Sequence, residues 1–318
     1  MFDFLSNFFT WTDKSQSVYP ESLVTMAVER AVDATDPRMR ILPGYAKSLR
    51  AAVIHAIDHV IALVDALPAA LPATPQGREA STVLGNLFSS SPRMAELLAQ
   101  DAALRDFVAT SPLTTASELT GLLVVQRNEK QGFGFALVDD KVLNDVQQTT
   151  VSFDAHRLLD IATTEAETRR LLKHRAFDYI LSVALAHVTE QRDERERLSQ
   201  QRTLLRCKLD ILQTNGSGFS RDMGPQDKNA LQTRLQEIEN QLEVLGPVHE
   251  VLQANLAIVT GILAEAEKHL WLETVNLRID QRFVLHSEAD TSVAAIPFVD
   301  ICDSDGKRAT AQLVQITR

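Results

Sequence analysis

Two histidines are the residues whose spacing first suggests chemistry. His55 and His59 stand four apart in the segment HAIDH, which has helical periodicity. Two imidazoles at that spacing lie on one helix face and can bind a single metal ion. The segment lacks the glutamate of the zinc-protease pattern HExxH, and no third ligand is nearby. We favour two ordinary helix histidines, with a metal or small-ligand enzyme site near them as the alternative.

Two short segments could also hold a ligand. Residues 303–306 (DSDG) have the acidic and glycine residues of a calcium loop, but no glutamate follows at the required distance, so a plain β-turn is favoured. Residues 132–135 (GFGF) lack the third glycine and the helix of a phosphate cradle, so glycines that relieve a packed strand are favoured. Scattered cysteines and histidines define no catalytic pairing. The sequence therefore predicts a protein that is not an enzyme and needs no cofactor.

Composition narrows the class of protein. The chain has 318 residues, 45% of them hydrophobic, which is enough for about two domains with real cores. Its net charge of -10 excludes nucleic acid as an expected partner. Cys207 and Cys302 form no CxxC motif, which favours a reducing cytoplasm. We recognise no signal peptide and no apolar run near the ~18 residues of a spanning helix.

The N-terminal segment, residues 1–19, is rich in aromatic residues. A helix there would gather five large apolar side chains on one broad face, namely Phe2, Leu5, Phe8, Phe9 and Trp11. Helices that lie on membranes usually carry Lys or Arg on the polar side, and here only Asp3 is charged before Asp13. A protein partner or the chain's own core is therefore favoured as the docking surface. Peripheral contact with a membrane through residues 1–12 is the alternative.

The hydrophobic pattern changes twice along the chain. Residues 20–112 keep a helical period broken by proline and glycine, which predicts a small helical domain. Residues 113–153 contain strand-like runs on either side of a polar turn at Gln126–Gln131. Residues 276–318 contain further strands, the last two joined by an Asp-Gly turn. We expect the two strand regions to form one split antiparallel β domain.

Residues 154–275 separate the two strand regions and have heptad spacing. The pattern predicts an antiparallel coiled-coil hairpin with a glycine-rich tip at residues 214–226, which contains Phe219. Gly246-Pro247 should interrupt the returning arm. Polar side chains occupy seam positions on the outgoing arm, namely Gln191, Arg195 and Arg202. These three, the tip and the N-terminal aromatic residues are the candidate interaction residues.

The predicted fold is therefore α+β and predominantly α. It consists of an N-terminal helical domain, a split antiparallel β domain and a long protruding coiled-coil hairpin. The predicted function is that of a cytoplasmic structural or adaptor protein, which assembles with itself or with protein partners through the hairpin. Membrane tethering or remodelling through the N-terminal segment is one alternative, and an enzyme with a site near His55 and His59 is the other.

Overall fold

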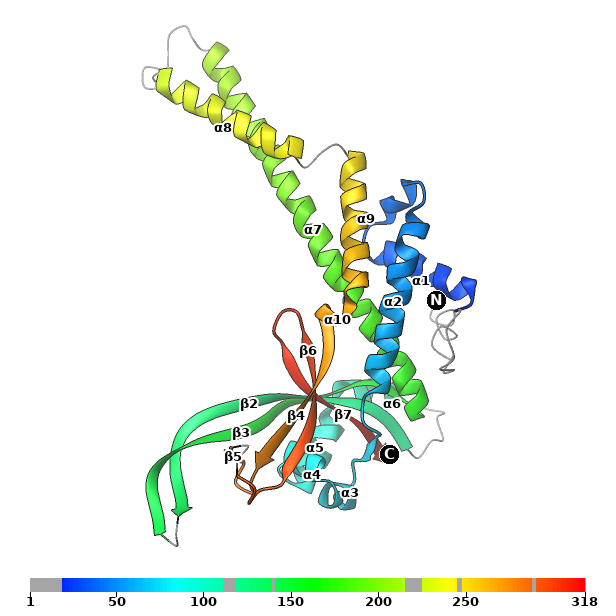
Figure 1. Cartoon of the computed structure of the whole chain (residues 1–318), viewed down its shortest axis with the longest axis vertical. Coiled ribbons are helices and arrows are strands. Elements are labelled where there is room, and N and C mark those ends of the chain that lie inside the picture. The colour runs from blue at the N-terminus through cyan, green and yellow to red at the C-terminus, as the bar shows by residue number, and fades with distance from the viewer. Residues whose placement is uncertain are drawn as a thin grey trace. The chain divides into compact units, whose positions relative to one another are not determined.

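The computed structural model describes residues 19–110, 118–138, 141–214, 225–244, 248–287 and 290–317. It has an α+β fold in which helices predominate, as the sequence predicts (Figure 1). The chain divides into two compact units within helices α2 and α7. One unit, called here the helical unit, contains the described residues within 19–57 and 178–266. The other, called the sheet unit, contains those within 58–177 and 267–317.

The helical unit is built from the long helices of the chain. Its elements are α1 (Glu21–Ala34), η1 (Pro37–Ile41), the first part of α2 (Tyr45–Asp65), the later part of α7 (Glu165–Thr214), α8 (Pro225–Val244), α9 (Val248–Ala264) and the start of α10 (Ala266–His269).

The sheet unit combines short helices with long strands. In chain order these elements are β1 (Leu71–Pro72), α3 (Pro75–Ala80), α4 (Thr82–Leu87), α5 (Ser91–Gln100), α6 (Ala102–Thr110), β2 (Glu118–Val138), β3 (Lys141–Ala162), β4 (Leu270–Ile279), β5 (Val284–His286), β6 (Ala295–Asp303) and β7 (Arg308–Thr317). The end of α2, the start of α7 and the end of α10 also belong to this unit.

The predicted joining of the two strand regions is confirmed. The strand order is β1-β7-β2-β3-β5-β4-β6, with a further pairing between β6 and β7. Strand β7 pairs antiparallel with β2 from Glu118 to Val125, so the end of the chain lies beside a strand nearly 200 positions earlier. Gly306 has a φ of 78° in the turn between β6 and β7, which is the conformation that the Asp-Gly signal predicts. All pairings are antiparallel except β1 with β7.

Three β-bulges shape the β2–β3 ladder. The register shifts after Thr120, Val124 and Gly134, and each shift places two β3 residues opposite one β2 residue. Each bulge contains a β3 residue with positive φ, namely Asp145 (60°), Ala155 (52°) and Asp160 (52°). Bulges bend and twist a ladder. The β2–β3 hairpin accordingly curves along its length (Figure 1).

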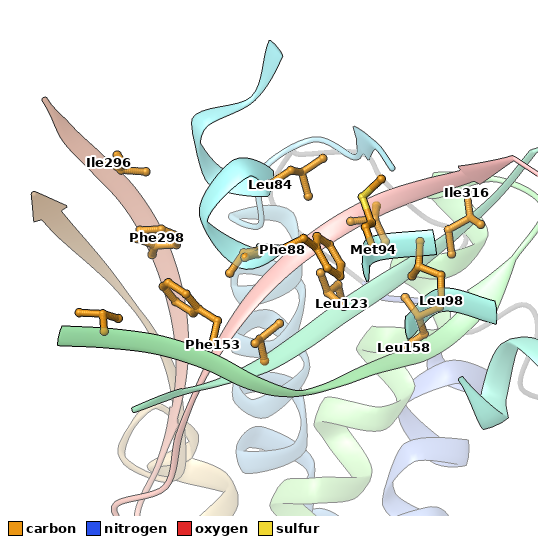
Figure 2. Close-up of a cluster of buried hydrophobic side chains, with 14 of the residues drawn as sticks. Leu84, Phe88, Met94, Leu98, Leu123, Phe153, Leu158, Ile296, Phe298 and Ile316 are labelled. Carbon is orange, nitrogen blue, oxygen red and sulfur yellow. The ribbon is translucent and has the colours of Figure 1, made fainter. Parts of the chain in front are cut away.

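The core of the sheet unit lies between the short helices and the strands. Figure 2 shows Leu84, Phe88, Met94 and Leu98 from the α4–α5 region near side chains of the sheet. Phe153 of β3 and Phe298 of β6 contact with ring centroids 5.2 Å apart. The buried strand residues of this cluster are Leu119, Leu123, Val125, Val151, Phe153, Leu158, Ile161, Leu277, Ile279, Ile296, Phe298, Val314 and Ile316.

Three local predictions are wrong. The polar segment Gln126–Gln131 is not a turn, because it pairs continuously with β3 in the middle of β2. Residues 154–162 are the end of β3 rather than helix, and α7 begins only at Glu165. Residues 270–275 belong to β4, where they pair with β6. In each case ladder hydrogen bonds from distant strands decide a conformation that local periodicity leaves ambiguous.

The helical unit packs α1 and η1 against the later helices. Arg30 of α1 donates to both carboxylate oxygens of Asp178 in α7, at 3.0 and 2.8 Å. Asn255 of α9 donates to Asp36 at 3.0 Å, and both residues are buried. Helix α8 ends at Val244 and α9 begins at Val248. The predicted interruption at Gly246-Pro247 falls between these two helices. Residues 245–247 themselves lie outside the described residues.

Candidate protein-interaction groove

Side-chain contacts in the sheet unit hold the first turns of helix α7. The Thr164 hydroxyl accepts the Glu167 N–H at 3.2 Å, which caps the first turn. One turn later, Thr168 donates to the Thr120 carbonyl of β2 at 2.8 Å. Lys173, only 5% exposed, pairs with Asp65 at the end of α2 at 2.8 Å. These contacts fix the start of a 50-residue helix that contains neither glycine nor proline.

Arg169 also holds the start of α7, through hydrogen bonds to the end of α2 and the turn after it. Its guanidinium donates to the carbonyls of Val64, Leu67 and Pro68 at 2.6, 3.0 and 3.1 Å. The last carbonyls of a helix and of the turn after it lack intrahelical donors. A cation at that end also interacts favourably with the negative end of the helix dipole. Arg169 therefore stabilises the end of α2 against α7.

In the helical unit, α8 lies alongside the distal part of α7 (Figure 1). Arg206 of α7 forms an ion pair with Glu239 of α8. Leu198 and Leu209 on α7 are 5% and 6% exposed, and Ile238 on α8 is 1% exposed, so these three apolar side chains are buried. Interlocking of α7 with α8 and α9 as a heptad coiled coil remains a prediction.

A groove of about 380 Å³ lies between α7 and α8. Arg195 and Arg202, two of the predicted polar seam residues, line it and are half-buried. No hydrogen bond or ion pair to another described residue engages the Arg202 guanidinium. The remaining lining residues are Ser199, Arg206, Glu239, Leu242 and Glu243. We call this surface the α7–α8 groove.

The third predicted seam residue, Gln191, is exposed and lines a second, larger hollow. This hollow measures about 980 Å³, and its described lining comes entirely from α7 between Ser182 and Arg197. It holds three acidic side chains, Glu190, Asp193 and Glu194, against the single cation Arg197. The polar middle of α7 therefore borders open space at all three predicted positions.

Arginine dominates the charged side chains of the groove. A guanidinium offers five N–H donors in a planar fork that matches a carboxylate. Arginine is enriched at protein interfaces, where burial away from water increases the importance of its pairing. The α7–α8 groove contains three arginines and two glutamates, so its charged groups sum to a positive charge in a chain of net charge -10. A partner side chain that carries a carboxylate fits this surface.

The histidine candidates form no metal site in the described part of the chain. Both lie on α2, as predicted. The His59 ring nitrogen Nε2 is 2.7 Å from the Leu270 carbonyl, to which it donates a hydrogen bond, so that nitrogen is not available to a metal. Among the described residues, no group of three or more His, Cys, Asp or Glu side chains is placed to hold a metal ion.

Sequence reasoning missed a histidine held between two carboxylates. His286 of β5 contacts Asp290 through Nδ1 at 2.9 Å and Asp280 through Nε2 at 3.3 Å. Burial lowers the pKa of His286, but the hydrogen bonds to Asp290 and Asp280 outweigh it and raise the pKa above 6.5. Hydrogen bonds from Ser292 and His286 lower the pKa of Asp290 to about 2. Both ring nitrogens are therefore engaged by carboxylates, and the three side chains form a clip that links residues on either side of β5.

Two exposed aromatic residues on β2 were also missed. Phe133 is 79% exposed and Phe135 is 64% exposed. The expectation that the glycines around them relieve a packed strand is wrong for Gly132, since a Cβ there would meet no atom within 4 Å. The alternation of glycine and phenylalanine was the available signal. It could not reveal exposure because the strand was expected to lie in a packed sheet.

The other predicted interaction residues lie outside the described residues. They are Phe2, Leu5, Phe8, Phe9, Trp11 and Phe219. No protein-family model matches this chain, and neither a curated protein nor a solved structure with significant similarity was found. Within the described ranges, no helix is long and apolar enough to cross a membrane.

Proposed function

We propose that this chain is a non-enzymatic structural or adaptor protein, which assembles with itself or with a protein partner through the hairpin of α7, α8 and α9. The observation that carries the proposal is the α7–α8 groove, in which Arg195 and Arg202 occupy positions that a self-contained coiled coil would fill with apolar residues. Polar residues at seam positions cost stability and specify partners. A third helix with a carboxylate that reaches Arg202 would complete the packing.

In the proposed contact, Arg202 recognises the charge of the partner and is held in place by the packing of α7 against α8. The ion pair of Arg206 with Glu239 holds one side of the groove, and the buried Leu198 and Leu209 hold α7 beneath it. Arg202 then projects from a fixed helix rather than from a loop. A preorganised side chain loses less conformational entropy on binding. A carboxylate on the partner helix would pair with Arg202 in a setting partly shielded from water.

The test replaces Arg202 with leucine in the full chain. Arg202→Leu should fill the seam with an apolar residue, leave the helix content unchanged and weaken the stoichiometric companion or homomer at least tenfold. Arg197→Leu is the matched control, because Arg197 lies five positions away on α7, is 63% exposed and pairs only with Glu194 within the described structure. Co-purification from the native cell and light scattering would measure assembly. Equal assembly by wild type and Arg202→Leu would refute this role of the groove.

Point variants are a better test of the hairpin than a deletion of the whole hairpin would be. The first three turns of α7 belong to the sheet unit, where Leu172 and Phe177 are each 4% exposed. A deletion that includes these residues would remove part of the core and confuse lost assembly with lost folding. The Arg202→Leu variant changes only the groove.

Membrane tethering through residues 1–12 is a second proposal, supported by the sequence of those residues alone. The four phenylalanines and the tryptophan in this segment could insert beside lipid headgroups. Co-sedimentation with anionic liposomes should then decrease when residues 1–12 are removed. Equal pelleting of both chains would exclude this anchor.

A further inference from the structure

The outer part of the β2–β3 hairpin leaves the rest of the sheet. Strand β7 pairs with β2 only as far as Val125, and β5 pairs with β3 only at Thr149 and Thr150. Beyond these positions β2 and β3 pair only with each other in the described structure. Figure 1 shows this two-stranded ribbon projecting from the sheet. We call β2 from Gln126 to Val138, with its β3 partners, the β arm.

A projecting two-stranded ribbon is marginally stable and has unpaired backbone groups along its edges. Isolated hairpins are marginally stable in water unless a further strand or helix covers them. The outer edge of β2 also presents backbone N–H and C=O groups that no described strand engages beyond Val125. Such an edge is a template for another strand. The β arm therefore has the geometry of a surface that is completed by strand addition.

The side chains of the arm point to the same conclusion. Phe133 and Phe135 are two positions apart, so they lie on one face of β2, and both are more than half exposed. Gly132 has no positive φ, and a Cβ there would meet nothing within 4 Å. Glycine weakens a strand interior unless another backbone must approach closely. No contact inside the described chain accounts for this glycine, whereas an added strand would.

We propose that the β arm pairs with the β arm of a second copy of this chain. The two β2 strands would run antiparallel about a two-fold axis at Gly134, which places Phe133 of each copy opposite Phe135 of the other. Opposite residues of an antiparallel ladder share a face, and aromatic pairs across strands are favourable. Such an interface is isologous, because the same residues contribute from both copies.

The sequence of the edge favours a second copy as its occupant, because Phe133-Gly134-Phe135 is symmetric about Gly134 and therefore matches itself in an antiparallel ladder. Two chains of net charge -10 repel one another, so they can touch only where few charges meet. Residues 131–135 (QGFGF) carry no charge and form the centre of the proposed pairing. A lipid surface fits less well, because the sequence places Asp139-Asp140 just beyond the aromatic residues and aspartate resists entry into the bilayer.

The size of this contact predicts a reversible dimer. A phenylalanine buries about 150–250 Å² when fully covered, but pairing at the strand edge covers only the sides of these four rings, so they supply less than about 600–1000 Å². Pairing of the two edge strands adds to this area. Specific interfaces bury about 1200–2000 Å² in total, and transient ones bury less. The arm contact therefore lies at or below the lower end of that range, and its dimer should dissociate on dilution through the micromolar range.

The register is tested by a cysteine at Gly134 in the full chain. Directly opposite residues of an antiparallel ladder are about 4.5–5.5 Å apart at Cα, within the reach of a disulfide. Cys207 is exposed and is first changed to serine, and Gln148→Ala removes the flexible side chain that a Cβ at Gly134 would meet. Gly134→Cys in this background should form a covalent dimer on mild oxidation. The matched variant Lys130→Cys, four residues from the axis, should not. Equal cross-linking of the two variants, or none at Gly134→Cys, would overturn the proposed pairing.

The energetic test uses charge at the exposed rings. The double variant Phe133→Lys, Phe135→Lys should halve the mass found by light scattering and weaken association at least tenfold, because lysines block edge-to-edge pairing. Ile41→Lys is the control, since Ile41 is 75% exposed and belongs to the helical unit, whereas the arm belongs to the sheet unit. An unchanged mass for the double variant, or a wild-type monomer that pellets with liposomes through these rings, would overturn the proposal. Neither result would bear on the α7–α8 groove, whose test uses Arg202.

Discussion

Asp65 and Lys173 should respond unequally to mutation, although they form one ion pair. Lys173 is 5% exposed, whereas Asp65 at the end of α2 is 36% exposed, and their charged atoms are 2.8 Å apart. Asp65→Asn leaves the buried ammonium group without its counter-charge. Lys173→Met leaves a carboxylate that water already reaches. The first change should therefore be much more harmful than the second.

The magnitude follows from burial. Removing one partner of a fully buried ion pair costs about 3–5 kcal/mol, and the exposure of Asp65 reduces the expected cost of Asp65→Asn to about 2–3 kcal/mol. Lys173→Met exchanges a buried cation for an apolar chain of similar shape, so its effect should stay within about 1 kcal/mol of zero. The double variant should resemble Lys173→Met, which gives a coupling of about 2 kcal/mol between the two sites.

Thermal unfolding measures these differences. One kcal/mol shifts the midpoint by about 2–4 °C in a domain of 150–250 residues, so Asp65→Asn should lower the midpoint of the sheet unit by about 4–12 °C. Arg197→Met is the control, because its pair with Glu194 is exposed to water and should contribute little to stability. Equal losses from Asp65→Asn and Lys173→Met, or additive losses in the double variant, would refute the assignment of the cost to the buried cation.

Three further changes test the sheet unit. The clip formed by Asp280, His286 and Asp290 should protect the β5 amides best between pH 3.8 and 6.5. Its contribution is lost above this range, as pH rises through the raised pKa of His286, and below it, as pH falls toward the lowered pKa values of the aspartates. Hydrogen exchange corrected for intrinsic rates would show this, and His286→Gln should abolish the loss of protection above pH 6.5. Ala155→Gly should raise stability by about 0.5–1 kcal/mol in urea unfolding, because φ is 52° at this alanine and the left-handed region costs an L-residue about 1–2 kcal/mol; a loss would contradict the strain argument. Phe298→Ala should lower stability by about 3–5 kcal/mol, because this ring is 1% exposed in the core, and a loss below 1 kcal/mol would show that the core refills the space.

The sequence predicts those elements that local chemistry determines. The Asp-Gly turn has one dominant conformation, and the structure places it between β6 and β7 with Gly306 at positive φ. The burial of Leu198, Leu209 and Ile238 follows from their spacing on helices. Each of these features depends on a few neighbouring residues.

The continuous strand through Gln126–Gln131 could not be predicted in this way. Five of its six residues on β2 are polar and exposed, and exposed polar runs usually mark turns. Pairing with β3 decides the conformation instead. The same limit applies to residues 154–162, where Ala155 and Asp160 adopt positive φ in bulges that no local pattern indicates. Long-range ladders therefore explain most of the differences between prediction and structure.

Each of the two proposed interaction surfaces contains a residue that is unfavourable for the local structure in which it lies. Arg202 stands half-buried at a position that favours an apolar side chain, and Gly132 weakens a strand without a steric reason. In natural proteins, local conformational preference, side-chain packing and hydrogen bonding usually favour the same structure, and the exceptions are concentrated at functional sites. A partner carboxylate would satisfy the first exception, and an added strand would satisfy the second. Because one contact is electrostatic and the other largely apolar, the groove and the β arm can be tested independently.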